Sequence, residues 1–197
     1  TLEVSGTSNL GADVTTSSTQ TYSGAVTLST DVTLTTTNSN VSFGATTNAG
    51  TAGDTLTIAA GSGDVTFTGA VGGTTAMGNI TITTGALSAA AMKVQGTFSI
   101  TNSDTSTITG IISDGASSAI VTKAGSATLT LSGNNTYTGQ TNINAGTLAV
   151  TVNNALGTNA AGTVIASGAT LDLQNVTYST TEAITNNGGT LSTSTGT

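Results

Sequence analysis

Residues 128–148 read TLTLSGNNTYTGQTNINAGTL, and this stretch decides the fold. Leu129 and Leu131 alternate with threonines, as in a short strand that buries one of its faces. A Ser-Gly-Asn-Asn turn follows, then a lone Tyr137, a Gly corner at Gly139, a short strand and a third corner, Asn-Ala-Gly. Gly and Asn allow such sharp bends. The closing Thr-Leu pair restarts the pattern, so the stretch is one coil of a repeating structure.

Similar units return along the whole chain. In the first half, segments 31–34, 54–58 and 79–82 recur about 24 residues apart, and in the second half a Thr-Leu pair recurs every 19 to 23 residues. A period near 20 with short strands is typical of a parallel β-helix. A β-sandwich also has short strands, but the regular spacing and the absence of proline argue against it. We therefore predict an all-β parallel β-solenoid of about nine coils of roughly 19–24 residues.

The composition supports this fold and excludes several functions. The chain of 197 residues is rich in Thr and has 3% aromatic residues, 6% charged residues, and no Pro, Cys, Trp or His. Thr favours strands, and a thin aliphatic core suffices for a solenoid, whose stability sums over neighbouring coils. The net charge of −7, with two Lys and no Arg, argues against nucleic-acid binding and against an anionic membrane surface. No apolar run is long enough to span a bilayer.

Stacked coils place equivalent residues above one another, which predicts inward ladders. We expect one ladder of Leu34, Ile58 and Ile82 and another that runs from Leu129 to Leu191. Phe43 and Phe67 should stack, with Phe98 extending that layer. The polar stretch 113–119 should mark a change of repeat type within a single solenoid, between residues 1–112 and 113–197.

At residues 120–148 the sequence resembles the passenger-associated β-strand repeat of bacterial autotransporters. The matching positions are Lys123, Gly125, Leu129, Leu131, Gly133, Asn135, Tyr137, Gly139, Ala145, Gly146 and Leu148. The first half resembles, more weakly, the degenerate repeats of filamentous-haemagglutinin-like surface adhesins.

These resemblances imply a secreted right-handed β-helix that is exported through an outer-membrane pore to the surface of a Gram-negative bacterium. The chain would then be a piece of a longer protein that acts in adhesion, aggregation or fibre formation. Its partners would be a host or neighbouring-cell surface, or further copies joined end to end into fibres. The outer-membrane barrel with which autotransporters end is not present here.

An enzymatic β-helix, such as a polysaccharide lyase or hydrolase, is the first competing hypothesis. Such enzymes need grouped carboxylates or a basic residue at the substrate. The nine acids are scattered with at most one per coil: Glu3, Asp13, Asp31, Asp54, Asp64, Asp104, Asp114, Asp172 and Glu182. We therefore predict no catalytic residue, no cofactor and no metal site. Asp31 and Asp54 recur at what looks like one repeat position, which would suit a weak calcium site, but we favour two solvated corner residues.

A Thr-rich solenoid that binds ice or another crystal surface is the second competing hypothesis. Thr-x-Thr pairs on a flat face would offer a regular lattice of hydroxyl and methyl groups, and Thr81/Thr83 is one such pair. The pairs do not recur in one register along the sequence, which argues against a flat array. The favoured function is a non-catalytic extracellular stalk or adhesin segment.

Overall fold

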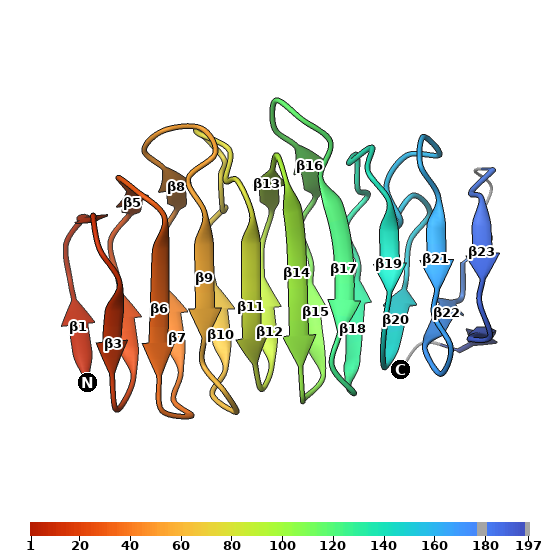
Figure 1. Ribbon diagram of the computed structural model, residues 1–197, viewed down its shortest axis with the longest axis horizontal. Coiled ribbons are helices and arrows are strands. Elements are labelled where there is room, and N and C mark those ends of the chain that lie inside the picture. The colour runs from red at the N-terminus through yellow and green to blue at the C-terminus, as the bar shows by residue number, and fades with distance from the viewer. Residues whose placement is uncertain (177–180, 196–197) are drawn as a thin grey trace.

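In the computed structural model, which describes residues 1–176 and 181–195, the chain winds into a stack of coils with three faces (Figure 1). All strand pairs are parallel. The chain runs from one end of the rod to the other, red to blue in Figure 1. Nine strands in one sheet mean nine turns, which confirms the predicted parallel solenoid. At the usual strand spacing the rod is about 40 Å long.

The first sheet has ten strands. They are β1 (Leu2–Val4), β4 (Gln20–Tyr22), β7 (Val41–Phe43), β10 (Val65–Phe67), β12 (Leu87–Ala89), β15 (Ser106–Ile108), β18 (Thr128–Leu131), β20 (Thr147–Val150), β22 (Thr170–Gln174) and β24 (Thr190–Ser194).

The second sheet has nine strands, which lie side by side along the front of Figure 1. They are β3 (Val14–Thr16), β6 (Val32–Thr36), β9 (Leu56–Ala59), β11 (Ile80–Thr84), β14 (Thr97–Asn102), β17 (Ile120–Ala124), β19 (Thr141–Ile143), β21 (Thr163–Ile165) and β23 (Ile184–Asn186).

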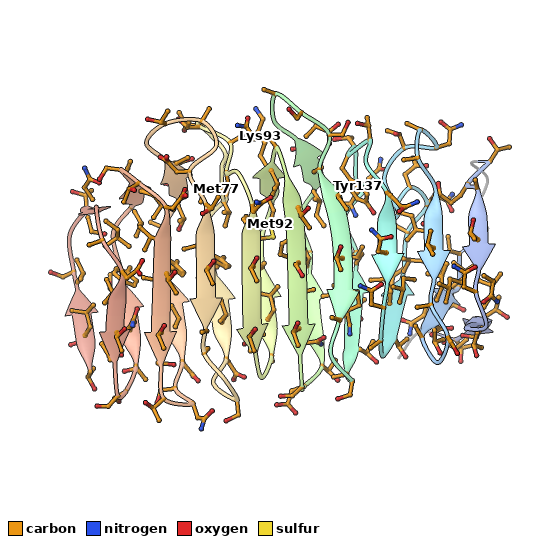
Figure 2. All side chains as sticks on the ribbon, in the orientation of Figure 1. Met77, Met92, Lys93 and Tyr137 are labelled. Carbon is orange, nitrogen blue, oxygen red and sulfur yellow. The ribbon has the colours of Figure 1, made fainter. Side chains whose placement is uncertain are left out.

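The third face is interrupted. It holds β2 (Ser8–Leu10), β5 (Val26–Leu28), β8 (Thr47–Ala49), β13 (Met92–Val94) and β16 (Ile112–Asp114). Single bridges from Val71 to Met92 and from Met77 to Val94 continue it between β8 and β16, in the region where Figure 2 labels Met77, Met92 and Lys93. After β16 no strand is formed on this face in the described residues, whereas the second sheet continues from β14 to β17 without a break.

Inward-pointing residues form the expected ladders. Leu34 pairs with Ile58 and Ile58 with Ile82, and all three are buried. Leu129, Leu148, Leu171 and Leu191 form the second ladder, of which only Leu191, in the last coil, is exposed. Register offsets run from 18 residues, between Ile80 and Phe98, to 24, between Val32 and Leu56. Both predicted ladders are confirmed.

The aromatic layer differs from the prediction at one end. Phe43 and Phe67 stack with ring centroids 4.6 Å apart, as expected. Phe98 does not extend this layer, because it lies in the second sheet between Ile80 and Val121. Tyr22 extends it instead, 5.2 Å from Phe43. The sequence interval of Phe98 is compatible with either sheet, and only the register decides.

Asp31 and Asp54 do not stack, which corrects the expectation of one shared repeat position. The register pairs Val32 with Leu56, so Asp31 lies level with Thr55. The Asp31 carboxylate accepts a hydrogen bond from the Thr55 backbone N–H at 2.8 Å, while Asp54 accepts from Gly50 and Thr51 within its own corner. An offset of 23 residues in a repeat of 24 therefore separates the two charges.

Candidate functional site: the repeat segment of residues 120–150

The residues singled out in the sequence lie on two successive coils, formed by β17, β18, β19 and β20. Leu129, Leu131 and Leu148 point inward and are fully buried. Leu129 lies above Ser106 and below Leu148, and Leu131 lies between Ile108 and Val150. These three leucines contribute an aliphatic core that a period-2 pattern predicts.

Lys123 is the unexpected member of the core. It occupies an inward position of β17, in register with Ile100 and Ile143, and its side chain is fully buried. Its Nζ donates hydrogen bonds to the carbonyl oxygens of Ala124 at 2.7 Å, Gly125 at 2.9 Å and Ala145 at 3.1 Å. Three donors meet three acceptors, so the ammonium is fully satisfied.

The three carbonyls belong to two stacked corners. Ala124 and Gly125 follow β17, and Ala145 follows β19 one coil later, so the Lys123 ammonium ties one corner to the next. Burial lowers the pKa of Lys123 to about 8, so the side chain is still largely protonated at neutral pH. A buried ammonium with no exposed surface reaches no substrate, and its chemistry is to hold the corners together.

Glycines allow these corners to pack closely. Gly125 has φ +81° and Gly146 has φ +65°, and both values lie in the left-handed region that side chains disfavour. A Cβ on Gly125 would meet the Asn102 backbone, and one on Gly146 would lie 2.5 Å from the Gly125 carbonyl oxygen. The Asn-Ala-Gly corner therefore needs glycine on both counts.

Gly133 and Gly139 need glycine for a different reason. Neither has a positive φ, so a conformational requirement at these two corners is not what the structure shows. A Cβ on Gly133 would instead clash with the Gly110 carbonyl oxygen of the coil below, and one on Gly139 with the Ala119 carbonyl oxygen. Close approach of stacked backbones is the constraint here.

Asn135 holds the third face where its strands have ended. Its Oδ1 accepts from the Ile112 N–H at 2.7 Å in the coil below, and its Nδ2 donates to the Ala155 carbonyl oxygen at 2.5 Å in the coil above. One side-chain amide thus spans three coils and substitutes for part of the missing ladder. This arrangement explains a buried Asn in an otherwise apolar setting, since each of its polar ends has a partner.

Tyr137 fills the space beneath this bracket. Its side chain is fully buried and its hydroxyl lies 2.6 Å from the Thr141 Oγ1 (Figure 2). A buried ring is a packing element of the coil and is not available as a platform for sugars.

Sequence reasoning missed two polar residues that join this segment to the coils before it. Asp114 accepts from the Ala119 N–H at 2.7 Å and from the Thr138 hydroxyl at 2.6 Å, which fixes the polar connection between β16 and β17. Asn102 donates to the carbonyl oxygens of Asp104 and Thr128 and to the Ser106 Oγ. Their positions in turn-like Ser-Asp-Gly and Asn-Ser-Asp stretches were the available signal.

The described part of the chain offers no group of three His, Cys, Asp or Glu side chains that could hold a metal ion. It also contains no helix that is long and apolar enough to cross a membrane.

Parallel coils with aliphatic ladders, glycine corners and an internal lysine define a structural β-solenoid repeat. Residues 121–150 match the family model described as Passenger-associated-transport-repeat. This match confirms the resemblance seen in the sequence, and the repeat is typical of autotransporter passenger domains, which are secreted to the surface of Gram-negative bacteria. Comparisons with curated proteins and with solved structures gave no match.

Proposed function

We propose that this chain is a non-catalytic spacer segment of an exported bacterial surface protein, which holds a binding region away from the cell. The observation that carries the proposal is the passenger-associated repeat at residues 121–150 within an uninterrupted stack of coils. Continuous backbone ladders along nine coils make a stiff rod, because each coil is bonded to both neighbours. The scattered acids and the fully buried Lys123 favour a structural role over catalysis.

The mechanism would be extension and stepwise folding. Coils that contact only their neighbours can fold one upon another as the chain emerges from an outer-membrane pore. We also propose a right-handed winding, because crossover connections between parallel strands are almost always right-handed.

A display experiment tests the spacer role. The chain would be fused between an outer-membrane anchor and an epitope in a Gram-negative host, next to a fusion with a flexible linker of equal residue number. We expect the epitope on the cell surface in both, at a fixed distance of about 40 Å from the anchor only with the solenoid. An epitope retained inside the cell, or the same spread of distances for both fusions, would contradict the proposal.

The partner would be a surface of a host or neighbouring cell, or a second copy stacked end to end. In the described residues, β3 and β23 each pair with a neighbour on one side only, and such edges can pair with another chain. Filaments in electron micrographs of the concentrated chain would support self-association, and monomers throughout would argue for the cell surface. Turnover of polyuronides by the purified chain would overturn the non-catalytic assignment.

A further inference from the structure

The outward face of the second sheet carries two columns of hydroxyl side chains over β6, β9, β11, β14 and β17. We call this surface the hydroxyl face; its members are Thr33, Thr35, Thr57, Thr81, Thr83, Ser99, Thr101 and Thr122. The first column is unbroken over five coils, from Thr33 to Thr122. The second column runs beside it from Thr35, and Ala59 and Ala124 take two of its five places.

This register corrects the expectation that Thr-x-Thr pairs do not align. Thr81 and Thr83 lie level with Thr33 and Thr35 of β6 and with Ser99 and Thr101 of β14, because the offsets of 24 and 18 residues absorb the irregular sequence spacing. The pattern was hidden in the sequence since the period changes from coil to coil.

The hydroxyl face has the geometry of a lattice. Parallel strands are about 4.8 Å apart, and alternate residues of one strand are about 6.7 Å apart. Figure 1 shows β6, β9, β11, β14 and β17 side by side at the front with little change of direction from one to the next. Buried residues such as Ile58, Ile82 and Ile100 lie between the two columns on the inner side and hold the strands in place.

The hydroxyl face is uncharged and its hydroxyls are unused by the protein. No Asp, Glu or Lys points outward from the five strands, because Lys123 points into the core. Within the described residues none of the eight hydroxyls makes a hydrogen bond to another protein atom, whereas Thr16 and Thr36 at strand ends bond to Ser18 and Ser39. Every Thr therefore presents a methyl group and an unpaired hydroxyl to solvent.

From this arrangement we infer that the hydroxyl face binds crystalline water, namely the surface of ice. A rigid array of methyl and hydroxyl groups, with spacings close to the repeat distances of hexagonal ice, orders adjacent water on the same lattice. The hydroxyls bond to that water and the methyl groups fill the gaps between its molecules. The face covers only about 250 Å², far below the roughly 800 Å² per partner that a specific protein interface buries. Adsorption to a repeating lattice therefore fits the face better than docking of a second protein.

Thermal hysteresis of the purified chain, together with inhibition of ice recrystallisation, tests the inference. The wild type should depress the freezing point below the melting point in a concentration-dependent way. Thr81→Lys, which places a long charged side chain in the middle of the first column, should abolish most of the effect. Thr107→Lys is the matched control, because Thr107 points outward at an equivalent place on the first sheet, between Ser88 and Thr130.

Circular dichroism melting confirms that each variant is folded. If Thr81→Lys lowers the melting temperature, Thr101→Lys in the second column carries the same test. Absence of hysteresis in the folded wild type would overturn the inference. So would an unchanged effect in the folded variants of the hydroxyl face, or equal losses in Thr81→Lys and Thr107→Lys.

Discussion

At the scale of single residues, Lys123 links pH to stability. Its folded pKa of about 8 lies below the ordinary 10.5. Between these values the unfolded chain binds more protons than the folded one, so stability should rise as pH increases from about 8 toward 10.5. The gain is at most about 3 kcal/mol, and urea unfolding at pH 7.5 and pH 9.5 would measure it.

Lys123→Met isolates this contribution. The variant keeps the length of the buried side chain but leaves the carbonyl oxygens of Ala124, Gly125 and Ala145 without their ammonium. We expect it to be less stable than the wild type by about 1–3 kcal/mol at neutral pH, if the corners do not admit water, and to lose the rise above pH 8. An identical pH profile for both chains would show that the titration belongs to another group.

Gly133 tests whether close backbone approach is the constraint at its corner. Gly133→Ala should cost about 1–3 kcal/mol, because the new Cβ would collide with the Gly110 carbonyl oxygen. Gly6→Ala is the matched control, since a Cβ there meets no atom within 4 Å, and its melting temperature should be unchanged. Equal melting of both variants would contradict the stacking of these two corners.

At the scale of strands, the ladder through Leu148 can be broken by one charge. Leu148→Asp places a carboxylate between Leu129 and Leu171 with no partner, and this should unfold the coils around it. Thr130→Asp is its control, because that residue is half-buried on the outer face of the neighbouring strand. Loss of the far-ultraviolet strand signal in the first variant alone is the expected result.

What could be predicted at this scale follows from locality. Alternation of apolar and polar residues gave the strands and ladders, because period 2 decides which side chains point inward. The partner of Phe98, the level of Asp31 and the alignment of the threonines depend on coil lengths that vary from 18 to 24 residues. Asn135 and Lys123 matched a motif, but their partners, Ile112 and Ala145, come from neighbouring coils and are not encoded by spacing alone.

At the scale of the whole molecule, the rod should resist trypsin. The chain has two lysines and no arginine. Lys123 is buried, and the backbone of Lys93 is bonded to Val71 on one side and Met77 on the other. We expect the folded chain to survive a digestion that cuts the urea-unfolded chain after both lysines, as read by mass spectrometry.

The variant Leu148→Asp supplies the contrast for that digestion. Unfolding near β20 should expose the peptide bond after Lys123 and leave Lys93 protected, because β13 lies farther along the stack. Cleavage of the folded wild type at Lys93 would show that the third face opens where its strands are interrupted.

The ammonium of Lys123 and the amide of Asn135 each reach from one turn of the rod to an adjacent one, and neither reaches further than that. A duplicated turn inserted between β18 and β19 would therefore meet the same neighbours on both sides as the original. Gene duplication could thus lengthen such a protein in steps of about 4.8 Å, with the cost of each insertion confined to its seam.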